Sequence, residues 1–152
     1  MTLSKLNRLA AKFAVAAEKL DDVDWDADYD AVRMMLRSLK LKWRIVGEWT
    51  RVIKVLDLDV ILKRRSGLSD SEIPSSNHTP WMVKYIIPTA SFYLPDTAAW
   101  VVQPVALRDN ARKYKAYDYF TKECVDRNKI RAYDIHPGNV GWYKGKPVLI
   151  DW

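Results

Sequence analysis

The sequence is poor in the features that mark secreted and membrane-embedded proteins. It has a single cysteine, Cys124, among 152 residues, so no disulfide can form within the chain, and this fits a reducing compartment. No apolar run approaches the length of a membrane span. The first residues lack the basic-then-apolar layout of a secretory signal. We therefore expect a cytoplasmic protein without a membrane partner.

Motifs that read nucleic acids or hold zinc are also missing. The chain shows no zinc-ligand spacing, no clustered base-reading motif and no RNA-binding aromatic signature. Its net charge of +6 favours an acidic partner such as a nucleotide, although a solvated Lys-rich surface is the simpler explanation for any single patch. We do not expect a nucleic acid as partner. What the sequence does contain is 49% hydrophobic residues, with seven tryptophans and eight tyrosines, which indicates a globular chain.

Two amphipathic helices are predicted at the start of the chain. Over residues 4–20 apolar side chains recur at helical spacing, with Ser4 as the N-cap. The apolar positions of this helix are Leu6, Leu9, Ala10, Phe13, Ala14, Ala17 and Leu20. This helix would pack either on the rest of the domain or against a second copy of the chain, so a homodimer is one of two alternatives. After an acidic linker, residues 29–42 predict a second helix, with Val32, Met35, Leu36 and Leu39 on one face.

Strand-like alternation follows, and a further helix comes late in the chain. The predicted strands are 43–48, 51–56, 59–65, 89–94 and 98–104. Residues 81–87 predict a short helix, and residues 110–126 a longer one. The core-facing positions predicted for the longer helix are Tyr114, Tyr117, Phe120 and Cys124.

The last part of the chain carries the most specific pattern. Asp134 and Asn139 lie five residues apart in a loop that Pro137 and Gly138 keep out of a helix. Residues 140–143 and 147–150 predict a hairpin that turns at Lys144-Gly145 and delivers Asp151 beside the loop. Three oxygen-bearing side chains would then converge, which suits Mg²⁺ and leaves one carboxylate free as a base. An ordinary hairpin with capping Asp and Asn in its turns is the alternative.

The pattern Asp-x-x-x-x-Asn, a hairpin and then Asp resembles the catalytic loop and metal-binding aspartate of the protein-kinase-like fold. The segment Asp-Ile-His-Pro-Gly-Asn is more similar to the aminoglycoside-phosphotransferase-like branch, and to small kinase-like proteins of bacteriophages, than to ordinary Ser/Thr kinases. This resemblance implies that Asp134 is the catalytic base. It also implies that Asn139 and Asp151 bind the metal, with Asp151 as the principal ligand.

The resemblance extends to the predicted strands. Val60-Ile61-Leu62-Lys63 resembles the kinase strand whose lysine holds the α- and β-phosphates of ATP. The expected glycine-rich loop is reduced to Gly47, with Thr50 and Arg51 as further phosphate-binding candidates. Backbone groups from Gln103 to Val105 would bind adenine. Glu72 is the acidic candidate to pair with Lys63.

Together these features predict an α+β fold with three parts. Residues 1–42 form a helical extension with an acidic linker, residues 43–107 a kinase-like N-lobe with an antiparallel sheet, and residues 108–152 a reduced helical C-lobe. The sequence stops one residue after Asp151, so we expect neither an activation loop nor the helical platform that binds substrates.

The resemblance implies a phosphotransferase that uses ATP and Mg²⁺, encoded by a phage and acting on a host or phage protein in the bacterial cytoplasm. A pseudokinase-like binding module that inhibits a host protein without catalysis is the alternative. A drug-phosphorylating enzyme is a third interpretation, although the acidic substrate pocket of that family lies in the missing part.

Overall fold

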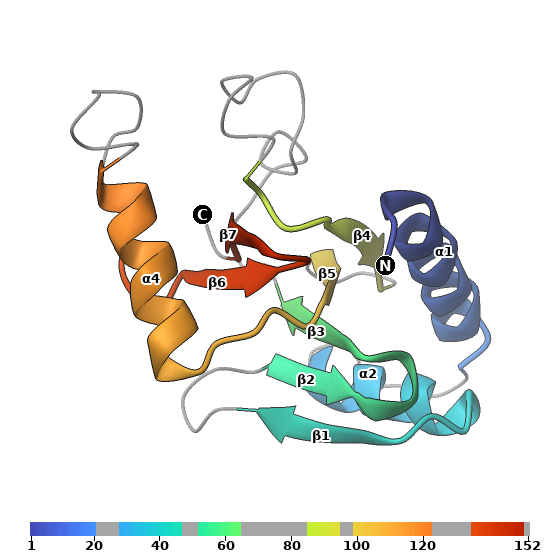
Figure 1. The fold of residues 1–152 in the computed structure, drawn as a ribbon. Coiled ribbons are helices and arrows are strands. Elements are labelled where there is room, and N and C mark those ends of the chain that lie inside the picture. Colours follow the sequence, from blue (N-terminus) through green and yellow to red (C-terminus); the bar gives the residue numbers. More distant parts are fainter. Residues whose placement is uncertain (21–27, 47–51, 65–84, 95–98, 123–134, 151–152) are drawn as a thin grey trace. The chain divides into compact units, whose positions relative to one another are not determined.

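The structure, a computed structural model, describes residues 1–20, 28–46, 52–64, 85–94, 99–122 and 135–150 (Figure 1). Within these ranges it contains helices, a five-stranded antiparallel sheet and a separate two-stranded sheet, so the predicted α+β class is confirmed. The chain divides into two compact units. Unit 1 is Met1–Ser75 with Pro88–Pro104, and unit 2 is Ser76–Ile87 with Val105–Trp152. The two N-terminal helices therefore belong with the large sheet.

Helix α1 spans Leu3–Glu18 and begins slightly earlier than the sequence predicts. The Thr2 hydroxyl, and not that of Ser4, caps it by accepting a hydrogen bond from the backbone N–H of Lys5 at 3.4 Å. The predicted apolar face is buried at four positions, Leu6, Ala10, Phe13 and Ala17, and Ala16, which was not predicted, is buried as well. None of the described helices is long and apolar enough to cross a bilayer.

Helix α2 spans Asp28–Ser38 and ends before the predicted boundary at residue 42. Lys40 has a φ of 54°, and the N–H of Leu41 reaches back to the carbonyl of Leu36 at 3.0 Å. This left-handed residue with its long return bond is the Schellman arrangement that terminates helices. The buried residues of α2 are Ala31, Val32, Met35 and Leu36.

The large sheet has the strand order β1-β2-β3-β5-β4, and all its pairs are antiparallel. Its strands are β1 (Trp43–Val46), β2 (Val52–Val55), β3 (Val60–Arg64), β4 (Ala90–Tyr93) and β5 (Ala99–Pro104). A single 3₁₀ turn, Leu56–Leu58, and Asp59 at a φ of 49° connect β2 to β3. Each strand lies within the segment predicted for it.

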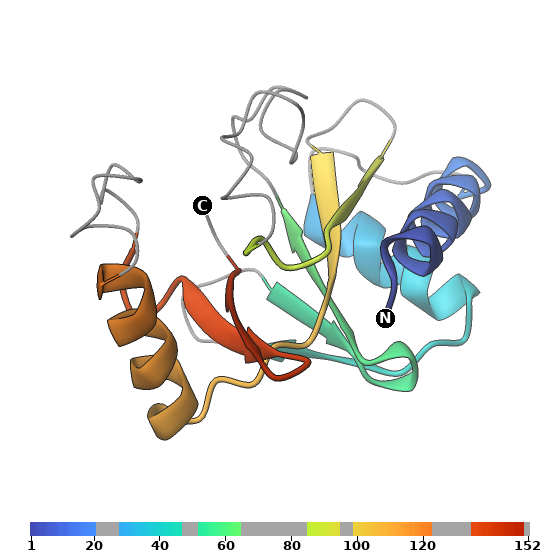
Figure 2. The ribbon, with the colours of Figure 1, turned by 45° about the horizontal axis from the view of Figure 1, so that its top comes forward.

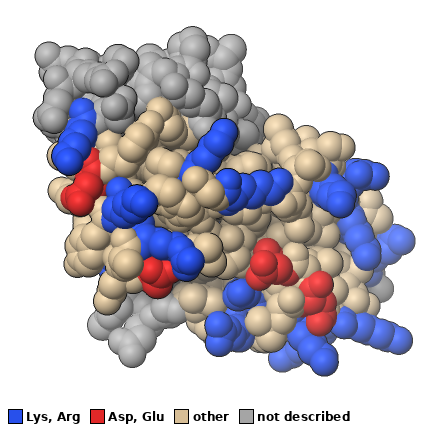
Figure 3. Space-filling model, viewed as in Figure 1, with Lys and Arg blue, Asp and Glu red and all other residues tan. Residues whose placement is uncertain are grey.

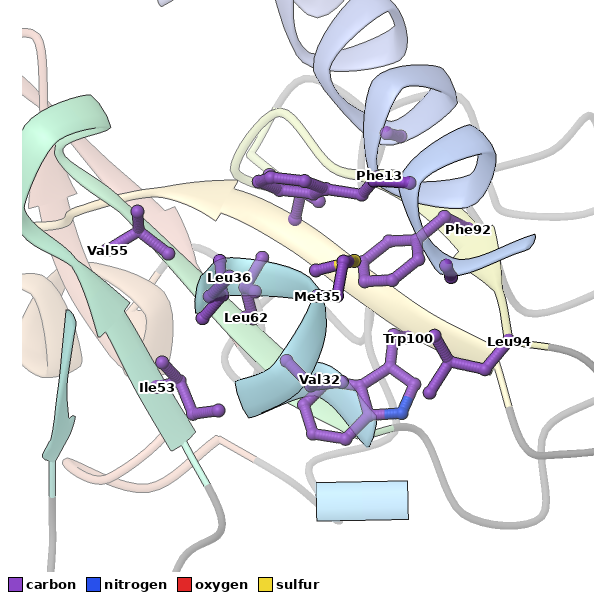
Figure 4. Close-up of a cluster of buried hydrophobic side chains, with 14 of the residues drawn as sticks. Phe13, Val32, Met35, Leu36, Ile53, Val55, Leu62, Phe92, Leu94 and Trp100 are labelled. Carbon is purple, nitrogen blue, oxygen red and sulfur yellow. The ribbon is translucent and has the colours of Figure 1, made fainter. Parts of the chain in front are cut away.

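One face of this sheet packs against α1 and α2, which lie together on the same side (Figure 2). Phe13 of α1 contacts Phe92 of β4, with ring centroids 5.5 Å apart (Figure 4). Strand residues buried in this core are Ile53, Val55, Val60, Leu62, Ala90, Phe92, Trp100 and Val102. Because successive side chains of a strand point to opposite faces, the residues between them form a second face.

We call this second face the Lys63 face. Its side chains are Arg44, Val46, Val52, Lys54, Ile61, Lys63, Ser91, Val101 and Gln103. Lys63 and Gln103, the described site residues of unit 1, therefore lie on the side of the sheet away from the two helices.

Unit 2 is organised around the hairpin of β6 (Val140–Tyr143) and β7 (Lys146–Leu149). Lys144 and Gly145 form its turn with φ values of 47° and 75°. Two consecutive positive φ values match the type I′ turn, whose twist suits a tight hairpin. The hairpin and its turn agree with the sequence prediction.

Two further segments extend the hairpin on both sides. Leu107 and Trp142 exchange backbone hydrogen bonds of 2.8 and 3.0 Å, beside β6. On the other side, the N–H of Ile87 bonds to the carbonyl of Leu149 at 2.9 Å, and Ile86 forms a parallel bridge with the same residue. The predicted helix over 81–87 is therefore wrong for its last part, because Ile86 bridges to β7 and both Tyr85 and Ile87 share backbone hydrogen bonds with Leu149.

Helix α4 spans Asn110–Phe120 and packs on the hairpin through Ala116 and Phe120. Tyr114 is 53% exposed, so its prediction as a core residue is wrong, whereas Tyr117 is half-buried. Cys124 lies outside the described residues. The helix starts at Asp109, whose side chain accepts a hydrogen bond from the N–H of Arg112 at 3.1 Å. That bond, followed by the nearby Arg112 guanidinium, lowers the pKa of Asp109.

Candidate functional site

The predicted site residues are distributed over both units. Lys63 and Gln103 belong to unit 1, and Asn139 belongs to unit 2. Val105 follows directly after β5 and is half-buried at the start of unit 2. The residues that lie outside the described ranges are Gly47, Thr50, Arg51, Glu72, Asp134 and Asp151. Their roles stay predictions, as does the meeting of residues from both units at one site.

Lys63 lies near the end of β3 and is half-buried. It pairs with Val52 on one side and with Val101 on the other, and Val52 pairs in turn with Val46. Val46 is the last residue of β1 and Val52 is the first residue of β2. The connection that contains Gly47 and Thr50 therefore joins two residues that lie in line with Lys63 across the sheet. The register thus brings Lys63 into line with both ends of the predicted phosphate loop.

The charge of the Lys63 face comes from three basic residues in β1, β2 and β3. Arg44 pairs directly with Lys54, and like charges in that position repel each other. The Lys54 amino group contacts the Asp59 carboxylate at 3.1 Å, which offsets part of this repulsion. On the face of the described residues that Figure 3 shows, Lys and Arg are spread widely and are not collected into one patch. The Lys63 face is therefore a cationic surface that favours an anionic ligand.

Gln103 lies on the same face, in the neighbouring row. It is 2% exposed, and its Nε2 donates a hydrogen bond to the hydroxyl of Thr89 at 3.0 Å. Among the described residues its Oε1 has no hydrogen-bond partner. Buried polar atoms of proteins are nearly always paired, so this oxygen is an acceptor suited to a ligand or a water molecule.

Asn139 is held beside the end of β7 by its backbone. Its N–H bonds to the carbonyl of His136 at 2.9 Å, and its own carbonyl accepts the N–H of Ile150 at 2.9 Å. Ile150 directly precedes Asp151 in the sequence. The structure therefore brings the backbone of one predicted metal ligand next to the residue that precedes the other.

Arg108 and His136 hold the shape of this loop, and sequence reasoning missed both roles. The Arg108 guanidinium donates to the carbonyl of Gly138 at 2.6 Å, and the His136 Nδ1 accepts the N–H of Gly138 at 3.0 Å. A Cβ on Gly138 would lie 2.5 Å from the His136 ring, so a larger residue there would displace the ring from its place beside the Gly138 N–H. His136 and Gly138 are close in the sequence, but no other feature of the sequence indicated either of these two hydrogen bonds.

The described residues fit part of a site for a magnesium nucleotide. A lysine, a cationic face and an unpaired buried acceptor suit a phosphate and a base, with half-buried Val52 opposite Lys63 and half-buried Ile61 opposite Gln103 on the same face. The side-chain oxygen of an asparagine is a ligand that Mg²⁺ accepts. No group of three His, Cys, Asp or Glu suited to a metal occurs within the described ranges.

Comparison with known proteins adds no relative to this description. The chain matches no protein-family model, no curated protein and no solved structure.

Proposed function

We propose that this chain is a kinase-like phosphotransferase that binds ATP with Mg²⁺ and phosphorylates a protein. The observation that supports this most directly is the hydrogen bond between the N–H of Ile150 and the carbonyl of Asn139. It joins the loop that follows Asp134 to the end of the strand that precedes Asp151, which is the arrangement that the kinase-like pattern requires. The bond continues the register of β6 and β7 by one pair, so it supports the proposal only by holding Asn139 and the residue before Asp151 at the same open end of the hairpin.

The roles of the residues follow from this proposal. Lys63 binds the α- and β-phosphates, and the Asp134 carboxylate accepts the proton of the attacking hydroxyl group. The side-chain oxygen of Asn139 and the carboxylate of Asp151 would hold the metal. When bound, Mg²⁺ supplies positive charge to the phosphate oxygens. We place the protein in a bacterial cytoplasm, encoded by a phage and acting on a host or phage protein.

The position of α1 and α2 limits how the protein substrate is bound. Both helices pack on the face of the sheet opposite to Lys63, so they do not cover the phosphate-binding face within unit 1. The acceptor protein is therefore bound by other parts of the chain. A homodimer formed through α1 is not needed for this function.

A pseudokinase-like binding module is the second candidate. It is favoured by residues 47–51, which contain one glycine followed by Glu48 and Trp49 where kinases use several glycines to bring the backbone close to the phosphates. Such a module would inhibit its protein target without transferring phosphate.

The first experiment measures the thermal stability of the protein with ATP and Mg²⁺. A ligand that binds only the folded state adds about 2.7 kcal/mol of stability at a concentration of 100 Kd. We expect this stabilisation in the wild type and its loss in Asp151→Asn and Lys63→Met. Lys54→Met is the matched control, because Lys54 lies on the same face and its amino group pairs with Asp59. No stabilisation of the wild type would contradict the nucleotide site.

A second experiment separates the enzyme from the binding module. Wild type and Asp134→Asn are incubated with radiolabelled ATP and a bacterial protein extract. Nucleotide binding by both variants with phosphate transfer by the wild type alone supports the enzyme. Nucleotide binding without transfer by either variant supports the binding module.

A further inference from the structure

A groove with a volume of about 450 Å³ lies between helix α1 and strand β4 in unit 1. One wall is the α1 face that runs from Asn7 to Glu18, and the other wall is β4 around Ser91. The contact between Phe13 and Phe92 joins the two elements in the core of this unit (Figure 4). Since protein cores are close-packed, this core sets the distance between the two walls.

The β4 wall offers backbone groups to a ligand. Among the described strands β4 is the last of the sheet, with β5 on one side only. In an antiparallel pair every second residue directs both its N–H and its C=O away from the partner strand. One of the consecutive residues Ser91 and Phe92 therefore directs these groups away from β5, and in the described part of the chain neither forms a backbone hydrogen bond outside the ladder. Strand β4 also lacks the charged residues that block pairing at many sheet edges, whereas the other edge strand contains Arg44.

The α1 wall matches an extended peptide in length and width. Asn7 and Glu18 are about 16 Å apart along the helix axis, which is the length of about five residues of a strand. Between them lie Ala11 and Ala14, whose small side chains leave room for the larger side chains of a peptide. The groove is therefore suited to one short strand.

The charge of the groove indicates which peptide it suits. Of the described residues that line it, only Glu18 carries a charge. The Glu18 carboxylate forms no ion pair with any described residue. The basic residues of α1, such as Arg8 and Lys12, are exposed but do not line the groove. A lysine or arginine of a bound peptide would therefore complement the groove at the Glu18 end.

We propose that α1 and β4 bind an extended segment of a partner protein, which adds to the sheet beside β4 and places a lysine or arginine next to Glu18. The main chain of the segment bonds to the outward groups of β4, and its alternate side chains lie over Ala11 and Ala14. This surface goes beyond the proposed function, because it needs neither nucleotide nor metal. It serves an enzyme and a binding module equally.

The test is a selection of random short peptides displayed on phage against the full-length chain. We expect enriched sequences that alternate in polarity, are rich in β-branched residues and carry Lys or Arg at one constant end. Synthetic copies are then titrated with single amides N-methylated. Methylation of an amide that bonds to β4 should weaken binding about tenfold, whereas methylation of the next amide, which points away, should have little effect.

Two variants test the two walls of the argument. Ala11→Arg should abolish peptide binding, because a long charged side chain occupies the groove. Val15→Arg is its matched control, since Val15 is 49% exposed on α1 and does not line the groove. Glu18→Lys should reverse the selection, so that Asp or Glu replaces the basic residue at the same end of the enriched peptides. Lys12→Glu is the control for charge and should keep the wild-type preference.

The proposal is overturned if no peptide is enriched, if the enriched peptides show no strand pattern, or if they bind Ala11→Arg as tightly as the wild type. A wild-type dimer that Ala11→Arg dissociates would, in the absence of enriched peptides, assign the groove to a second copy of the chain. Hydrogen exchange gives an independent readout, since a bound strand should protect an outward amide of β4. Unchanged exchange at Ser91 and Phe92 would exclude strand addition.

Discussion

The two units reach their structures by different means. In unit 1 two helices and one face of a five-stranded sheet share a single continuous apolar core, which contains Trp100, Phe13 and Leu62. Unit 2 has two smaller apolar clusters, one around Phe120 and one around Ile87, and much of its order comes from backbone hydrogen bonds between segments far apart in sequence.

This difference indicates where each unit is sensitive to substitution. A large apolar core is stabilised by burial, so unit 1 should lose most when a core side chain is truncated. Unit 2 depends on close backbone approaches, so it should lose most when a side chain is added where the chains are tight or when a bond to the loop is removed.

Truncation of Trp100 should have the largest effect. Its side chain is 0% exposed and its ring centroid lies 5.9 Å from that of Tyr29. Replacement of a buried tryptophan by alanine removes many contacts and leaves a cavity, so Trp100→Ala should lower the free energy of unfolding by about 4 kcal/mol. Urea unfolding measures the loss, and hydrogen exchange should locate it in the amides of unit 1.

Trp100→Phe is the matched control for this prediction. The indole N–H of Trp100 is buried without a hydrogen-bond partner in the described part of the chain. Phenylalanine keeps much of the ring volume and removes the unpaired donor, so this variant should stay within about 1 kcal/mol of the wild type. An equal loss of stability in both variants would contradict the packing argument.

Gly141→Val should have the next largest effect on stability, and this effect should arise in unit 2. A Cβ at this position would lie 3.0 Å from the Cβ of Ala106 and 3.4 Å from the carbonyl oxygen of Leu107. The two further methyl groups of valine should destabilise the protein by about 2 kcal/mol through overpacking. Urea unfolding measures the effect, and hydrogen exchange should show weakened protection of β6. A neutral Gly141→Val would show that residues 106–108 move away at little cost.

Arg108→Met should have a smaller effect on stability but a clear local one. Loss of its hydrogen bond to the Gly138 carbonyl should lower the free energy of unfolding by about 0.5–1 kcal/mol. Because this bond supports the loop that contains Asn139, we also expect weaker binding of ATP with Mg²⁺. Calorimetry measures that loss. Unchanged amide exchange over residues 135–139 would argue against this role for Arg108.

The smallest expected effect concerns Asp109 and depends on pH. The backbone N–H of Arg112 lowers the pKa of Asp109 in the folded state, so its carboxylate stabilises the fold above the unfolded pKa of about 3.9. This contribution is lost as the pH falls through the lower, folded-state pKa. Asp109→Asn keeps a capping oxygen without the charge, so its stability should differ from the wild type at pH 7 and converge with it in acid. Thermal melts at several pH values test this convergence.

The strands of unit 1 could be predicted because their segments are rich in β-branched and other apolar residues. Val52–Val55 and Val60–Arg64 show this composition, and in the structure the more buried side chains alternate along both strands. The start of α1 was harder, since Thr2 and Ser4 are both good capping residues and the apolar period fits either start. The face of α4 was misjudged because its aromatic residues occur all around the helix, and packing selects Ala116 and Phe120.

The parts of the site that a sequence motif specifies could be predicted. The parts that depend on contacts between residues far apart in the sequence could not. The hairpin after Asn139 has a turn sequence that specifies it. Tyr85–Ile87 was missed because so short a segment shows no period, and its partner Leu149 lies far along the chain. Arg108 stands in a polar segment that carries no signal for a bond to Gly138. The contact of Gln103 with Thr89 depends on the strand register, which the apolar pattern alone does not give.

The interleaving of the units affects the order in which the protein forms during synthesis. All of unit 1 has been made once Pro104 is added, whereas Tyr85–Ile87 belongs to unit 2 and pairs with β7, which is made later. At about 5–20 residues per second, the ribosome needs a few seconds to bridge that interval. During this time Ile86 and Ile87 lack their partner strand while unit 1 can already be folded. This nascent segment is therefore a candidate site for early chaperone binding.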